Sequence, residues 1–170
     1  MTLFPHYQAL GRERLGISLD RLMVFVVAQN IGMALFSIPA GRMADWFGNR
    51  IVLRVVILAI CAAPILALTL SRMGTFGSRW FFFVFVIVGL TPVTMRIFAN
   101  FALELGDRSE QPRLLGVLSL CMAGPAVFSS TLLGLLLDYA GFEIVFAIVI
   151  VCLVVGWLVT FLLEEPRASH

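Results

Sequence analysis

The sequence predicts an all-α integral membrane protein with five transmembrane helices. Apolar residues make up 61% of the 170 positions, against roughly 45–50% in soluble domains. Charged residues make up 13%, and the mean hydropathy is +1.02. A soluble domain of this length has too little interior to bury so much apolar surface. The composition therefore excludes a soluble enzyme, a soluble nucleic-acid-binding domain and a disordered chain, which would be rich in charge.

Five apolar runs are each long enough to cross a bilayer, which takes ~20 helical residues. We expect helices because a helix satisfies its own backbone hydrogen bonds in lipid. The connections are short and no linker divides the chain, so residues 1–170 are expected to form a single membrane domain. The expected spans are 22–40, 51–70, 80–99, 114–137 and 144–163.

The two ends of the chain are polar. Residues 1–21 carry charges and lack the apolar core of a signal peptide, so we expect an outer polar segment with one amphipathic turn. Residues 164–170 are expected to form a tail. Arginine counts near the span ends, seven against five, place the 41–50 loop and the C-terminus in the cytoplasm. The expected location is the plasma (inner) membrane.

The most informative stretch is Gly41–Arg50, between the first two apolar runs. Gly41 is expected to let the chain leave a helix, and Gly48 to allow a second tight turn. Asp45 can cap a helix N-terminus or meet an arginine. Arg50 can pair with Asp45 or face lipid phosphates. The alternative interpretation is an ordinary solvated turn.

This stretch resembles the signature loop of the major facilitator superfamily, which is written G-x-x-x-D-R-x-G-R-R. The sequence departs from that pattern at Trp46 and Asn49, where the family often has basic residues. In the family this loop is a latch between helices, which biases the carrier between inward-open and outward-open forms. The resemblance implies this role, with a thinner charge network, for Gly41, Asp45, Gly48 and Arg50.

The rest of the chain is also similar to that family. The pattern Gly124, Pro125, Gly134 and Asp138 looks like its eleventh helix, and residues 164–167 look like the charged stop after its last helix. Each half of the family fold has two helices before the signature loop, and here one span precedes it. The resemblance therefore implies helices eight to twelve of a twelve-helix carrier, a partial half-bundle without helix seven.

The function implied by this resemblance is secondary transport of a small solute by alternating access. We expect the chain alone to be inactive, because the other half of the carrier is missing. The alternative function is a small five-span accessory or scaffold subunit of a membrane complex. The expected partners are membrane lipids, an unknown small solute, and the missing N-terminal half of a carrier or a second copy of the chain.

Two amides lie near the middle of the first span. Polar groups are costly in lipid, so they tend to face protein or a water-filled cavity. Gln29 and Asn30 are expected either to line a substrate path or to hydrogen-bond across a helix interface. Asn100, in the connection after the third span, is a further candidate for lining the path.

Arg96 is the most notable charge within a span, in the cytoplasmic third of the third run. Our prediction is that it pairs with Asp45 in the latch. It can also face an anionic substrate, or reach the headgroups as long basic side chains do. We expect Arg54 to reach the cytoplasmic surface in that way, and Asp138 and Glu143 to be solvated.

Catalytic and metal-binding constellations are not expected. His6 and His170 lie near opposite ends of the chain, and the three cysteines are far apart in sequence. We therefore expect no enzymatic activity, no cofactor and no metal. A net charge of +2 without a clustered basic face does not indicate a nucleic-acid partner.

Overall fold

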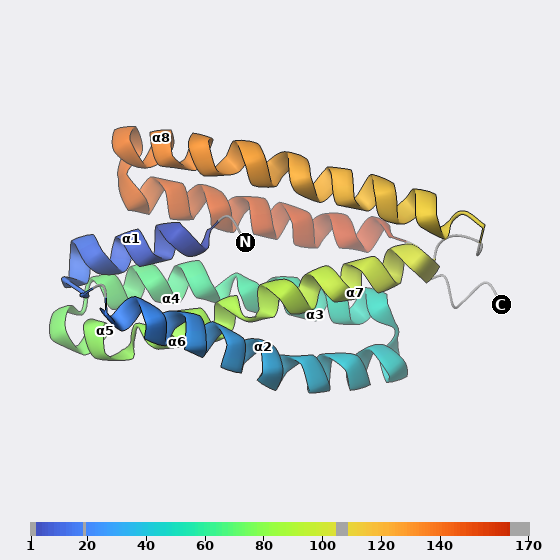
Figure 1. The fold of residues 1–170 in the computed structure, drawn as a ribbon, viewed down its shortest axis with the longest axis horizontal. Coiled ribbons are helices and arrows are strands. Elements are labelled where there is room, and N and C mark those ends of the chain that lie inside the picture. The colour runs from blue at the N-terminus through green and yellow to red at the C-terminus, as the bar shows by residue number, and fades with distance from the viewer. Residues whose placement is uncertain (1–2, 19, 105–108, 164–170) are drawn as a thin grey trace.

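The chain folds into a bundle of helices that run along one common direction (Figure 1). The structure is a computed structural model that describes residues 3–18, 20–104 and 109–163, without the side chains of residues 122 and 124–130. Within these ranges it contains no strand. The helices are α1 Phe4–Leu15, α2 Asp20–Phe47, α3 Asn49–Ile60, α4 Ala62–Ser71, α5 Gly74–Trp80, α6 Phe82–Val88, α7 Leu90–Glu104 and α8 Gln111–Val159, followed by the 3-10 turn η1 Thr160–Leu162.

Four segments of the described part are long and apolar enough to cross a membrane. The first three match the first three expected spans: α2, then α3 with α4 over 49–71, then α6 with α7 over 82–104. The fourth is Thr131–Leu162, within α8 and η1. The expected span 114–137 includes side chains outside the description, so the number five stays a prediction.

The helix α8 reverses direction at Gly141, where φ is 74° and ψ is 171°. Its residues before and after Gly141 therefore form two antiparallel arms (Figure 1). A positive φ of this size is costly for residues with a Cβ, so a glycine is the natural residue for the reversal. The second arm carries the buried side chains of Val145 and Phe146.

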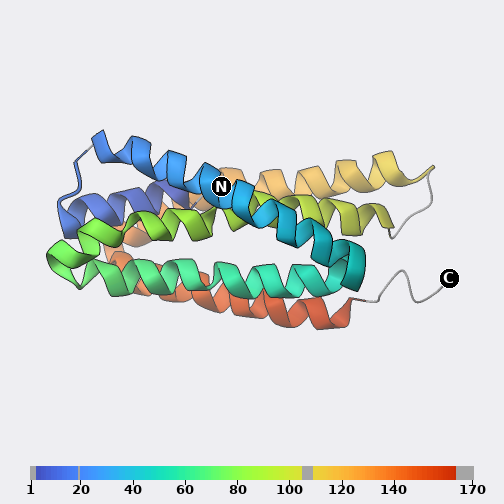
Figure 2. The same cartoon turned by 90° about the horizontal axis from the view of Figure 1, so that it is seen from below.

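The two ends of the bundle hold different connections (Figures 1 and 2). One end contains the α1–α2 connection, α5 and the reversal of α8, and is called here the Gly141 end. The other contains the α2–α3 turn, the end of α7 and η1, and is called the Gly48 end. The connections expected outside and those expected in the cytoplasm are thus gathered at opposite ends of the bundle.

The segment expected to be polar contains a full helix inside the bundle. In α1, Tyr7 and Leu10 are buried, and the Tyr7 ring lies 5.0 Å from the Phe146 ring and 6.3 Å from the Phe85 ring between centroids. The expectation of one amphipathic turn was therefore wrong. Its charged residues lie near the end of the helix, and they obscured an apolar stripe at helical spacing.

Aromatic rings form the centre of the bundle at the Gly141 end. Phe81, Phe85 and Phe146 are fully buried, and Phe25 of α2 stacks on Phe85 with 4.3 Å between ring centroids. A second apolar cluster lies nearer the Gly48 end, between α3 and α7. Many large apolar side chains face outward instead, as expected for a surface that lipid chains cover.

Two glycines set the separation of α2 from α6. A Cβ added at Gly32 would overlap the carbonyl of Val86, and one added at Gly89 would lie 2.5 Å from the backbone oxygen of Gln29. Small residues at such crossings let helix backbones touch, as is common in membrane bundles. This contact holds Gln29 beside the junction of α6 and α7.

The predicted 41–50 loop is mostly helical. Gly41 lies inside α2, so the expectation that it ends the first helix was wrong. The helix continues to Phe47, and the chain turns at Gly48, where φ is 84°. The predicted tight turn at Gly48 is confirmed, and a single residue separates α2 from α3.

Candidate functional site

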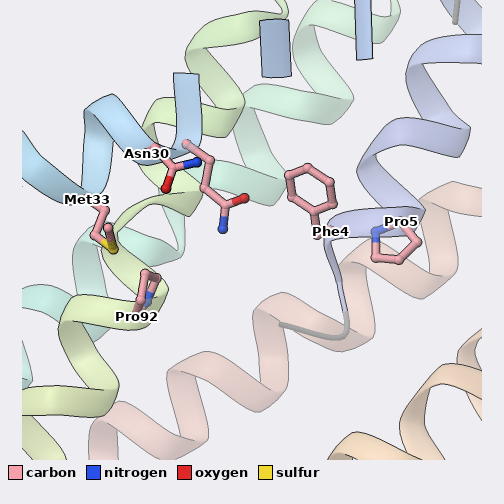
Figure 3. A pocket seen from close by; sticks show the side chains of 6 residues that line it. Phe4, Pro5, Asn30, Met33 and Pro92 are labelled. Carbon is pink, nitrogen blue, oxygen red and sulfur yellow. The ribbon is translucent and has the colours of Figure 1, made fainter. Parts of the chain in front are cut away.

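A cavity of about 340 Å³ lies beside the two amides of α2. Its walls come from α1, α2 and α7, as Figure 3 shows for Phe4, Asn30 and Pro92. The lining residues are Phe4, Pro5, Gln29, Asn30, Met33 and Pro92. The structure thus brings together Gln29 and Asn30, as the sequence analysis placed them, with residues of two other helices.

A smaller cavity of about 60 Å³ shares Phe4 and Gln29 with the first. Tyr7 and Thr91 also line it, between otherwise apolar walls. Gln29 is therefore the amide common to both cavities, and its side chain is half-buried. Its position in two adjoining cavities makes it the central polar group of the candidate site.

The chemistry of both cavities is uncharged at neutral pH. Among the described residues, their linings contain amides, hydroxyls, a thioether and apolar groups, and no carboxylate, guanidinium or imidazole. Asn30 donates a hydrogen bond from Nδ2 to the Val26 carbonyl oxygen at 2.8 Å, within its own helix. Its Oδ1 then has free acceptor capacity. The site offers amide donors and acceptors beside aromatic and aliphatic surface.

Local sequence explains how the site is positioned. Gly32 and Gly89 hold α2 against α6, which puts Gln29 and Met33 beside the start of α7. Pro92 lies in the first turn of α7, where a missing backbone N–H is tolerated. The cavity is therefore bounded by helix backbones that contact each other directly.

Sequence reasoning missed the contribution of α1. Phe4 and Pro5 line the larger cavity, and Tyr7 lines the smaller one. The signal was present, because Phe4, Tyr7 and Gly11 recur at helical spacing. Asn100, the other predicted path residue, is exposed on α7 and lines neither cavity.

The predicted latch residues lie at the Gly48 end. Asp45 is exposed near the end of α2, and Arg96 is exposed on α7, which contacts α2. Within the described residues, no ion pair joins Asp45 to Arg50 or Arg96. Arg50 is half-buried at the start of α3, and its Nε has no hydrogen-bond partner among the described residues. The pairing of Asp45 with Arg96 stays a prediction.

Arg54 contacts the end of the last helix, and its expected reach to the cytoplasmic membrane surface stays a prediction. Its Nη2 donates to the Thr160 carbonyl oxygen at 3.1 Å, and its guanidinium lies 4.1 Å from the centroid of the Phe161 ring. The carbonyls in the last turn of a helix lack intrahelical donors, so an arginine there is stabilised. Arg54 thus links α3 to the end of the last helix.

Glu143 forms the ion pairs at the Gly141 end. Its Oε1 lies 3.0 Å from Arg72 Nη2 and 3.7 Å from Arg14 Nη1. These contacts connect the second arm of α8 to α1 and to the end of α4. Glu143 remains partly exposed, so it is both solvated, as expected, and paired. Exposed pairs of this kind contribute little stability individually.

Comparison with known proteins identifies the family. The family model of the Major Facilitator Superfamily matches residues 1–170, the whole sequence. No curated relative and no solved structure matches the chain at a significant level. The match agrees with the apolar helices and with the signature pattern around Asp45. The chain therefore belongs to the Major Facilitator Superfamily, a family of integral membrane transporters.

Proposed function

We propose that the chain is the C-terminal part of a secondary transporter that moves a small solute by alternating access. It corresponds to helices eight to twelve of a twelve-helix carrier and crosses the membrane five times. The observation that carries this proposal is the cavity at Gln29 and Asn30, in a chain whose whole length matches the family.

The cavity supports the proposal because exposed residues form part of its lining. Three helices of this chain line it, and both Asn30 and Pro5 at its edge are exposed. A carrier places its substrate between two halves, near the bilayer midplane. The opposite half of the carrier would supply the remaining wall of the cavity.

The placement of α1 also fits this interpretation. Its buried residues pack on the rings of α6 and α8, as those of a bundle helix do. In the proposed alignment α2 is helix eight, and α1 is a bundle helix that precedes it. This differs from the sequence-based expectation that residues 1–21 form an outer loop.

The latch role is assigned to the turn at the Gly48 end. Gly48 allows the abrupt α2–α3 turn, and Asp45 and Arg50 stand on either side of it. The buried Nε–H of Arg50 donates no hydrogen bond to a described residue. In another conformation of the chain it can donate a hydrogen bond to a carboxylate. In this proposal, Gly41 is a helical residue without a turn function. The Gly48 end and the C-terminus face the cytoplasm, in the plasma membrane.

Cysteine accessibility tests whether the cavity is a water-filled path. We expect Asn30→Cys, in a chain whose native cysteines are replaced by alanine, to react with a membrane-impermeant maleimide. Ile31→Cys is the matched control, because Ile31 is the next residue along α2 and is 51% exposed on the apolar surface. The Ile31→Cys thiol is expected to stay unreactive, because the maleimide reacts with the thiolate and a thiol in lipid does not ionise. Equal labelling of the two positions would contradict a water-filled path at Asn30.

A further inference from the structure

Two adjoining cavities at the Gly141 end share the side chains of Arg21, Ser78 and Arg79. The larger has a volume of about 620 Å³ and lies between the end of α1, the start of α2 and α5. Arg14 and Thr75 also line it. It therefore gathers three guanidinium groups and two hydroxyls, and its lining in the described part of the chain includes no carboxylate.

The arginines of this cavity are poorly neutralised by the protein. Arg21 and Arg79 form no ion pair within the described part of the chain. Arg14 has one, a long contact of 3.7 Å to Glu143, whose same oxygen accepts a shorter bond from Arg72. Three like charges lining one cavity repel each other unless an anion lies between them. The cavity is thus complementary to a negatively charged group.

The second cavity extends this basic site along the membrane-spanning surface. It has a volume of about 270 Å³ and runs from Arg21, Ser78 and Arg79 to an apolar wall. That wall is formed by Val24 and Phe25 of α2 and Phe82 of α6. Next to it, the Trp80 ring stacks on Phe83 with 5.4 Å between centroids. Tryptophan is typical of the headgroup level of a membrane. The apolar wall next to Trp80 therefore lies at the depth of the lipid acyl chains.

We propose that these two cavities form one binding site for an anionic phospholipid. The phosphate lies among the three arginines, which donate paired hydrogen bonds to its oxygens. The Thr75 and Ser78 hydroxyls are further donors, and an acyl chain lies against the apolar wall. A free anion would occupy only the first cavity, and a zwitterionic lipid would bring a compensating positive charge. The combination selects a lipid with net negative charge.

The test uses the purified full chain reconstituted in phosphatidylcholine vesicles with a trace of spin-labelled lipid. The immobilised fraction of the label measures binding to the protein surface. We expect labelled phosphatidylglycerol to bind in preference to labelled phosphatidylcholine. One arginine near a membrane surface corresponds to about a fivefold change in affinity for anionic lipid. Arg21→Ala combined with Arg79→Ala should therefore remove most of the preference.

A charge-matched control separates this site from general attraction. Arg12→Ala combined with Arg42→Ala removes two positive charges from exposed positions that line neither cavity. This control should keep the preference for phosphatidylglycerol. A preference absent from the unmodified chain, or lost equally in both double variants, would overturn the proposal. Circular dichroism of every variant confirms that it is folded.

A groove variant distinguishes a lipid from a free phosphate. Val24→Trp fills the second cavity at a position that is 52% exposed, so the fold should tolerate it. It should lower binding of labelled phosphatidylglycerol several-fold while the arginines stay intact. Inorganic phosphate should compete no better than chloride at equal ionic strength. Unchanged lipid binding in Val24→Trp, with displacement by inorganic phosphate, would show an anion site without a lipid groove.

Discussion

Single glycines decide where this bundle can pack backbone on backbone. Gly32 and Gly41 belong to the same helix, but their surroundings differ. A Cβ at Gly32 would overlap the Val86 carbonyl, and a Cβ at Gly41 would meet nothing within 4 Å. The close approach of α2 to α6 at Val86, and with it the position of Gln29, therefore requires a hydrogen atom at Gly32 where other residues carry a Cβ.

The pair of glycines gives a matched test of this packing. Gly32→Ala should destabilise the protein by about 1–3 kcal/mol, the usual cost of overpacking, because the obstructing atom belongs to the backbone. Gly41→Ala should be neutral or stabilising by up to ~1 kcal/mol, because alanine favours a helix interior. Thermal unfolding in detergent measures both changes. Equal shifts in the two variants would mean that the α2–α6 contact is looser than described.

At the scale of elements, the α2–α3 turn is shorter and stiffer than a flexible loop. The helix α2 extends to Phe47, so Asp45 is carried on a rigid helix that also contacts α7. Arg54 links α3 to Thr160 at the end of the last helix. A movement of α2 against α7 would therefore bring Asp45 toward or away from Arg96 without rearranging the turn.

A charge exchange tests the predicted latch between α2 and α7. Asp45→Arg and Arg96→Asp should each change the labelling rate of Asn30→Cys, because each leaves like charges facing one another. Combining the two exchanges should restore the rate toward that of the parent protein. As a control, Asp45→Arg with Arg42→Asp exchanges charges within α2 and should restore nothing. Failure of the first pair to recover what the single changes lost would refute the pairing.

At the scale of the whole molecule, this bundle has a cavity with exposed residues, Pro5 and Asn30, at its edge. The described side chains between residues 111 and 140 include none that is buried. In the proposed alignment the first arm of α8 is helix eleven. An exposed helix of this kind can be covered by lipid, by a second copy or by the other half of a carrier.

We expect the 170-residue chain alone to carry no solute. Reconstituted vesicles should show the same uptake and counterflow of radiolabelled small solutes as protein-free vesicles, because a central site needs both halves. Vesicles with Gly32→Ala serve as a second inactive reference. Solute counterflow by the isolated chain would contradict the half-carrier proposal.

The mass of the native product gives an independent check. An antibody raised against the sequence of residues 164–170 should detect, in native membranes, a band more than twice the mass of 18.8 kDa. A band of that size would show that this sequence is the C-terminal part of a full carrier. A band near 18.8 kDa would instead favour the alternative of a short accessory subunit, whose partners could be isolated with the same antibody.

Sequence alone determined the features that depend on local chemistry. The apolar runs predict α2, the α3–α4 span and the α6–α7 span because bilayer thickness sets their length. The turn at Gly48 follows from a glycine between two apolar runs. The amides Gln29 and Asn30 were recognisable as candidates because polar groups within a span require a partner or water.

Only the tertiary structure decided which surfaces meet. In a membrane helix the lipid-facing and protein-facing residues are both apolar, so periodicity cannot distinguish them. The cavity between α1, α2 and α7, and the contact of Arg54 with Thr160, 106 positions away in sequence, therefore could not be predicted. The pairing of Glu143 with Arg72 and Arg14 likewise requires helices remote in sequence to lie side by side.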